Sequence, residues 1–559
     1  MKFRGFRQAI VVGIAALLMA VGGLGSGQNR AAQASTLAPA RTTPEAIAFI
    51  PERTIAFGTL LLDASDWEAA QLEAVPSRQR RQFRRRLTDL KRGLRRFGIR
   101  YDRDIKPWIG SETTVALVSR DEDRNPDNGQ QPGYLAAIAT DDAEASIAFL
   151  ERVWRRRASQ TIGQAGIEVT YLPQPSGGGL ATAQVGERFV LLASHLSVLQ
   201  DAISSAQVPS LNVRARPQYR AAIAQIPSQA IGFILGAPKV LARYLPSSLQ
   251  LWPLQAAEPG AAEIQLLASA TLSEPGILIQ AGPHLDNGSS LVAASTDEAA
   301  APQLAALARW FPPTSTAVIL DRDLDARWSE ALIKADTAGT AAILAAIAPD
   351  DIDALGADIQ DIRDWVVPWV NQPYAVAKLP KLEGRDQPDW LFATPMDDAV
   401  EAGLADLDQR AQSQGLTVGR IPYAKQTLTV WTALSAGVPA DEPGGDIPAL
   451  IAEVKGVHTV VEDTVLLATS IGAVAQALQA AEVDGISPLV EALGPSSSYL
   501  RLDGSQVPKR LAEATGDRRL ADWAEPLQGI VEAVTLTQQG ADSGPSTVRL
   551  LLEVAGDPR

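Results

Sequence analysis

The chain has 559 residues, a formal net charge of −14, 46% hydrophobic residues and no cysteine. This composition is that of a globular chain with ample material for a core, and the length suggests two to four domains. The absence of cysteine excludes disulfides and thiolate metal sites, and the acidic balance argues against general nucleic-acid binding.

The first 34 residues have the pattern of a secretory signal peptide. Three basic residues precede an apolar run at 9–24, and the small-x-small sequence at 32–34 resembles a cleavage site. The run is short for the roughly 20 residues that cross a bilayer, so we predict cleavage after Ala34, with a retained N-terminal membrane anchor as the alternative. Cleavage leaves 46 basic and 64 acidic side chains, a net charge of −18.

The first half alternates helices with pairs of short strands. Strands are predicted at 54–62, 113–118, 134–140, 263–271 and 276–281, and helices at 77–98, from 141 to about 157, and from about 194. Asp141 with Glu144 is typical of a capping box, and His195, at the start of a helix, is interpreted as a cap or a solvated side chain. The loop 121–127 has oxygen-bearing residues at alternate positions, but a proline stands where a calcium loop needs glycine, so we interpret it as a solvated loop.

Several motifs recur later in the chain. Trp67 and Trp108 have counterparts at Trp328 and Trp369, 261 residues downstream in both cases, and Trp108 and Trp369 each follow a proline. The Asp-Asp pair at 141–142 recurs at 397–398, and Val-Leu-Leu-Ala-Ser at 190–194 recurs as Val-Leu-Leu-Ala-Thr at 465–469. The spacing changes most between 423 and 460, which we interpret as an inserted loop, because surface loops tolerate insertion.

This recurrence predicts two tandem homologous repeats. Each is expected to be α+β, with mostly antiparallel or mixed sheets and packed helices. The predicted boundaries are a signal peptide at 1–34, a first repeat at 44–284, a linker at 285–305 and a second repeat at 306–556.

No pattern for chemistry stands out. The three histidines, His195, His284 and His458, are not at metal-ligand spacing, and we place the last two in loops. The chain has neither a Gly-x-Ser-x-Gly nucleophile elbow nor a phosphate-binding loop. We therefore predict no catalytic, cofactor-binding or metal site, and an enzyme is the less favoured class.

The unusual feature is a basic segment at 78–103, with twelve basic residues against two aspartates. A solvated amphipathic helix is the plain interpretation, but so dense a run repels itself and calls for an acidic surface. An acidic protein surface is favoured over anionic lipid headgroups, and a third alternative is the acidic stretch at 350–364 of the second repeat. The predicted contact residues are Arg78, Arg80, Arg81, Arg84, Arg85, Arg86, Lys91, Arg92, Arg95 and Arg96.

The export signal, the duplicated Pro-Trp and Asp-Asp motifs and the Val-Leu-Leu-Ala strand together resemble DUF3352, a family of exported, mostly cyanobacterial proteins known as a domain of unknown function. The resemblance implies the periplasm or thylakoid lumen and supplies no catalytic residues. We expect a non-catalytic binding or scaffolding protein. The alternatives are a hydrolase with its site between the two halves and a peripheral membrane-surface protein that uses the basic segment.

Overall fold

The computed structural model describes residues 44–62, 101–124, 127, 130–155, 158–173, 179–237, 265–273, 276–284, 297–325, 365–380, 388–437, 449–496, 498–505, 531–539 and 547–554. The chain divides into two compact units. Unit 1 contains the described residues up to 284 together with 547–554, and unit 2 contains those from 297 to 505 with most of 531–539.

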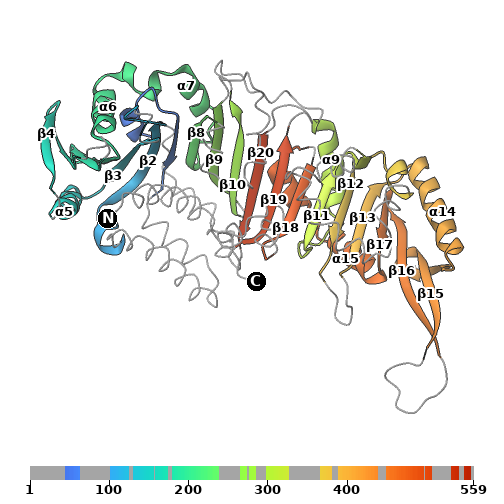
Figure 1. The fold of residues 1–559 in the computed structure, drawn as a ribbon. Helices are drawn as coiled ribbons and strands as arrows, with labels where there is room; N and C mark the ends of the chain where they lie inside the picture. Colours follow the sequence, from blue (N-terminus) through green and yellow to red (C-terminus); the bar gives the residue numbers. More distant parts are fainter. Residues whose placement is uncertain are drawn as a thin grey trace, which may run out of the picture. The chain divides into compact units, whose positions relative to one another are not determined.

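An antiparallel sheet forms the body of unit 1, with strand order β4-β5-β6-β7-β3-β2-β1-β8-β9-β10-β20 (Figure 1). Its register places Ala137 of β3 between Thr114 of β2 and Leu191 of β7. The strands are β1 (Ala56–Leu60), β2 (Ile109–Ser119), β3 (Gly133–Thr140), β4 (Gln160–Gln164), β5 (Ile167–Tyr171), β6 (Ala181–Val185), β7 (Phe189–Ala193), β8 (Ala230–Gly236), β9 (Gln265–Ser273), β10 (Gly276–His284) and β20 (Thr547–Val554).

Helices cover both faces of this sheet. Leu191 of β7 is fully buried in a core with Leu199 of α6, whereas its neighbour Val190 packs on the opposite face with Phe149 of α5. Successive strand residues point to opposite faces, so the apolar run of β7 reflects burial on both sides. The helical elements are η1 (Ala46–Phe49), the π-helical turn η2 (Tyr101–Ile105), α5 (Ala143–Trp154), α6 (Leu196–Gln207), η4 (Pro209–Leu211), η5 (Val213–Ala215) and α7 (Pro217–Ile223).

Unit 2 is built on an antiparallel sheet with strand order β14-β15-β16-β17-β13-β12-β11-β18-β19. Its strands are β11 (Ala317–Asp321), β12 (Tyr374–Lys378), β13 (Trp390–Pro395), β14 (Thr417–Tyr423), β15 (Gln426–Gly437), β16 (Ala449–Val461), β17 (Thr464–Ala468), β18 (Ser498–Asp503) and β19 (Val531–Gln539). Its helices are α9 (Asp297–Ala308), η8 (Val367–Trp369), α14 (Asp398–Ser413), α15 (Ile471–Ala481) and α16 (Ser487–Leu493). Packed helices on antiparallel sheets agree with the predicted α+β class.

The two Pro-Trp pairs make the same kind of contact. The indole Nε1 of Trp108 donates a hydrogen bond of 2.7 Å to the carbonyl of Asp104, four residues upstream, and Nε1 of Trp369 donates to the carbonyl of Trp365. Trp108 is 1% exposed and packs on Phe149 of α5, with ring centroids 5.4 Å apart. Each tryptophan therefore buries its ring while its polar edge remains satisfied by the preceding turn.

The helices α5 and α14 share a capping arrangement. Oδ1 of Asp142 accepts from the backbone N–H of Ala145 at 2.9 Å, and Oδ1 of Asp397 accepts from that of Val400 at 2.8 Å. The prediction that Asp141 caps α5 is wrong by one residue. The cap requires an extended backbone immediately before the first helical residue, and Asp142 has that conformation.

The predicted insertion between 423 and 460 is not a loop. Most of it forms the long hairpin strands β15 and β16, of 12 and 13 residues, where β5 and β6 have five residues each. Gly456 lies against Trp431 so closely that a Cβ there would be 2.3 Å from the indole ring. Residues 438–448, which hold much of the Gly and Pro content that suggested a loop, lie outside the described residues.

Gly403 of α14 provides a test of the tryptophan packing. A Cβ at this position would lie 2.3 Å from Cγ of Trp369. Alanine is ordinarily the better helix former by about 0.5–1 kcal/mol, but overpacking costs about 1–3 kcal/mol, so Gly403→Ala is expected to lower the free energy of unfolding. Denaturant titration measures this, and the loss should shrink in a Trp369→Phe background. A Gly403→Ala variant more stable than the wild type would contradict the packing.

Candidate functional site

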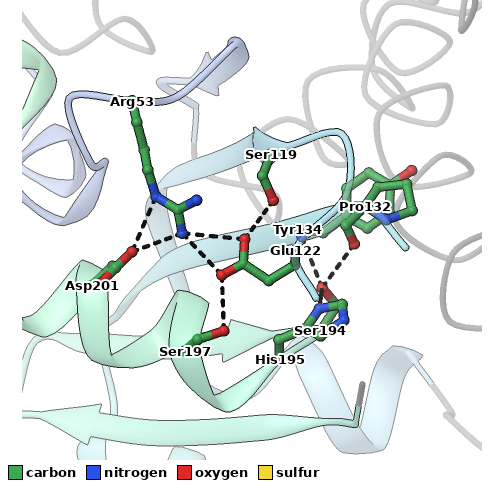
Figure 2. A network of polar contacts seen from close by, with 9 residues as sticks. All are labelled: Arg53, Ser119, Glu122, Pro132, Tyr134, Ser194, His195, Ser197 and Asp201. Atoms are coloured by element: carbon green, nitrogen blue, oxygen red, sulfur yellow. Dashed lines mark hydrogen bonds and ion pairs between the residues drawn. The ribbon is translucent and has the colours of Figure 1, made fainter. Parts of the chain in front are cut away.

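A network of polar side chains joins three segments of unit 1 (Figure 2). Arg53, just before β1, donates from Nη2 to Oε1 of Glu122 at 3.0 Å and to Oδ2 of Asp201 at 2.7 Å. Glu122, in the loop after β2, also accepts from the hydroxyl of Ser197 at 2.8 Å and from that of Ser119. Ser197 and Asp201 lie one turn apart on α6, so the network fastens this helix to β1 and to the loop.

The carboxylate at its centre is buried. The side chain of Glu122 is 5% exposed and that of Arg53 is 39% exposed. Burial alone raises the pKa of Glu122, but hydrogen bonds from Arg53, Ser119 and Ser197 outweigh it and hold the pKa below its ordinary value. The loop 121–127 was predicted to be solvated, yet Glu122 points inward, and Asp121 accepts from the backbone N–H of Gln131 at 2.9 Å.

Ser194 and His195 connect β7 to α6. Oγ of Ser194 accepts from the backbone N–H of Tyr134 at 2.8 Å, donates to the carbonyl of Pro132 at 3.2 Å and lies 2.9 Å from Nδ1 of His195. Since the hydroxyl has one hydrogen, donation to Pro132 leaves Nδ1 as the donor toward Ser194. His195 occupies the N-cap position of α6, as predicted, but its side chain makes no capping hydrogen bond. The residue is 3% exposed, so the alternative of a solvated side chain is wrong.

Thr469 makes matching contacts at the end of β17. Its Oγ1 accepts from the backbone N–H of Trp390 at 2.9 Å, and its own N–H donates to the carbonyl of Trp390 at 3.1 Å. Ser194 has the same two-way exchange with Tyr134, because its N–H donates to the Tyr134 carbonyl at 3.0 Å. A hydroxyl that occurs at both positions, with a histidine beside only one, serves to fix the strand end.

A second histidine lies in unit 2. Nε2 of His458 is 3.0 Å from Oδ1 of Asp408, which also accepts from Nε1 of Trp431 at 2.6 Å. The two rings are 5.9 Å apart between centroids. Asp408 belongs to α14, whereas Trp431 and His458 belong to β15 and β16, so this carboxylate attaches the helix to the long hairpin. The prediction that His458 lies in a loop is wrong.

These arrangements fit structural roles. A small pocket in unit 1, with room for about one water molecule at about 10 Å³, is lined by nine residues, none of which is His, Asp or Glu. Within the described ranges, no group of three His, Asp or Glu side chains is arranged to hold a metal ion. Sequence patterns missed both carboxylate clusters, because Arg53 and Asp201 are 148 residues apart and no local spacing signals such a pair.

The predicted contact residues of the basic segment, Arg78, Arg80, Arg81, Arg84, Arg85, Arg86, Lys91, Arg92, Arg95 and Arg96, lie outside the described residues. So do the predicted signal peptide and the acidic stretch at 350–364. His284 ends β10. Among the helices that the structure describes, none has both the length and the apolar character needed to cross a membrane.

A family model described as "Protein of unknown function (DUF3352)" covers residues 10–554. The chain belongs to this family. No curated protein and no solved structure matches the chain. The resemblance to DUF3352 that the sequence motifs indicated is thus confirmed, and the match covers nearly the whole chain.

The buried carboxylate of Glu122 predicts an acid-sensitive fold. Because its folded pKa is lowered, it stabilises the native state above its unfolded pKa of about 4.3, and this stability is lost as the pH falls through the folded pKa. In Glu122→Gln the free energy of unfolding should therefore change less between about pH 5 and pH 3. Urea titrations across this range measure it, and an unchanged pH dependence would contradict the assignment.

Arg53 is expected to matter at neutral pH. Arg53→Met removes charged hydrogen bonds to Glu122 and Asp201 and should cost about 1–3 kcal/mol of unfolding free energy. Lys455→Met is the matched control, because its ion pair with Glu453 has both side chains about half or more exposed and should cost less than about 1 kcal/mol. Equal costs in the two variants would show that the network stabilises the fold no more than an exposed ion pair does.

Proposed function

We propose that the chain consists of two tandem homologous α+β repeats, at 44–284 and 306–556, joined by a linker at 285–305. The strand orders support this: β4-β5-β6-β7-β3-β2-β1-β8-β9 in unit 1 has the same sequence of positions as β14-β15-β16-β17-β13-β12-β11-β18-β19 in unit 2. Further support comes from the tryptophan contacts, the aspartate caps of α5 and α14, and the strand-end hydroxyls of Ser194 and Thr469.

We propose that the protein is exported and acts by binding or scaffolding rather than by catalysis. The supporting observation is that the Ser194–His195 and His458–Asp408 pairs make structural contacts. Oγ of Ser194 accepts from one strand end and donates to a carbonyl, and Asp408 holds both His458 and Trp431. A nucleophile and its base need an accessible reaction space, whereas His195 is 3% exposed.

The proposed contact surface is the basic segment, and the proposed partner is an acidic protein surface in the periplasm or thylakoid lumen. Twelve basic residues at 78–103 stand in a chain whose net charge is −14. Like charges at this density repel one another, and an acidic surface relieves that repulsion. The alternative partner is a surface of anionic lipid headgroups, which would contribute about 1 kcal/mol of binding free energy per basic residue. An experiment must distinguish this partner from an acidic protein.

The test is sedimentation of the chain from Ser35 with anionic and with neutral vesicles, at low and high salt. If the segment binds lipid, the protein should pellet with anionic vesicles and not with neutral ones. High salt should abolish this pelleting. Arg84→Glu, Arg85→Glu and Arg86→Glu together should then weaken vesicle binding by about 100-fold or more, from about 1 kcal/mol per lost basic residue. This result would assign the segment to membranes and overturn the choice of an acidic protein.

The test for a protein partner treats intact cells that export the chain with a cross-linker. The wild-type chain should be captured with an acidic protein, and the triple variant should lose that product. The matched control replaces three exposed basic residues of unit 2, Arg420, Lys425 and Lys455, by glutamate, which changes the charge equally. Loss of the product in both variants would mean that net charge alone matters, and no loss in either would reject the basic segment as the contact.

A further inference from the structure

The small pocket in unit 1 lies where α7 meets the sheet. Its lining includes Tyr219 of α7, Thr54 just before β1, Phe57 of β1, Gly236 of β8 and Gln265 of β9. The ring of Tyr219 packs against Phe57 with centroids 6.1 Å apart. A helix of seven residues therefore reaches three strands through a contact that is partly polar.

Two hydroxyls at this pocket are buried without a partner. Thr54 and Tyr219 are each 3% exposed. Neither Oγ1 of Thr54 nor the phenol oxygen of Tyr219 has a hydrogen-bond partner in the structure as described. A buried hydroxyl in that state costs about 1–3 kcal/mol, so two at one small pocket need an explanation.

We propose that this pocket is a binding site for a single ordered water molecule, which bridges the hydroxyls of Thr54 and Tyr219. The volume of about 10 Å³ is that of about one water, and buried waters take two to four polar partners. Gln265, which has a side-chain amide, also lines the pocket. The bridge joins α7 to the segment before β1, where Arg216 already donates from Nη1 to the carbonyl of Thr54 at 3.1 Å.

The ionisation of Tyr219 agrees with such a site. Burial raises the pKa of this phenol to about 12, an increase that Glu112 reinforces and Arg214 opposes. The hydroxyl is therefore protonated at neutral pH and serves as both donor and acceptor, as a bridging water requires. Larger ligands do not fit, because the space admits about one water molecule.

The direction in which Tyr219→Phe changes the thermal stability distinguishes a hydrated site from a dry one. If the water is bound, Tyr219→Phe breaks its bridge and should lower the thermal midpoint by about 2–4 °C, the equivalent of one hydrogen bond. If the hydroxyls are dry, the same change removes an unsatisfied buried group, and the midpoint should stay or rise. Tyr171→Phe is the control, because that phenol bonds to Gln160 in an exposed position.

A double-mutant cycle and a high-resolution crystal structure complete the test. Thr54→Val should cost less in the Tyr219→Phe background than in the wild type, because both hydroxyls act through one water. Electron density for a water within hydrogen-bond distance of both oxygens is the expected result. Additive losses, or a pocket without such density, would overturn the proposal.

Discussion

A sheet with apolar side chains on both faces needs a helix fixed to each face, and the buried tryptophan of each Pro-Trp pair meets this need. The ring of Trp108 packs on Phe149 of α5, and that of Trp369 touches Gly403 of α14. Because each indole N–H is satisfied by the carbonyl four residues upstream, the ring is buried without an unpaired donor. Strands such as β7, which is apolar along its whole length, depend on that cover.

Polar side chains inside the described parts of the two units also fix helices in place. Glu122 gathers Arg53 and two serines, and Asp408 gathers Trp431 and His458, so each carboxylate joins a helix to strands or to a loop. This structural use of the polar groups is the ground on which we propose a binding role for the chain. The proposed contact then belongs to the basic segment, whose charge opposes that of the rest of the chain.

The sequence predicted most elements whose signal is local. Apolar runs gave the strands around 56–60, 134–140 and 465–468, and recurring motifs gave the family. What it missed depends on partners far along the chain or on a shift of one residue. Asp142 rather than Asp141 caps α5, and His195 is buried although it stands at the start of α6. The long strands β15 and β16 were hidden by small residues that a loop would also favour.

The central claim, that the polar groups of the strand ends are structural, is tested most directly by the unfolding free energies of Ser194→Thr and Ser194→Ala. Thr469 fills the matching position in unit 2 with a threonine hydroxyl. We expect Ser194→Thr to keep the wild-type stability to within about 0.5 kcal/mol, whereas Ser194→Ala should lose about 1–3 kcal/mol because the Tyr134 N–H loses its hydroxyl acceptor. An alanine variant as stable as the wild type, or a threonine variant weaker than the alanine one, would contradict it.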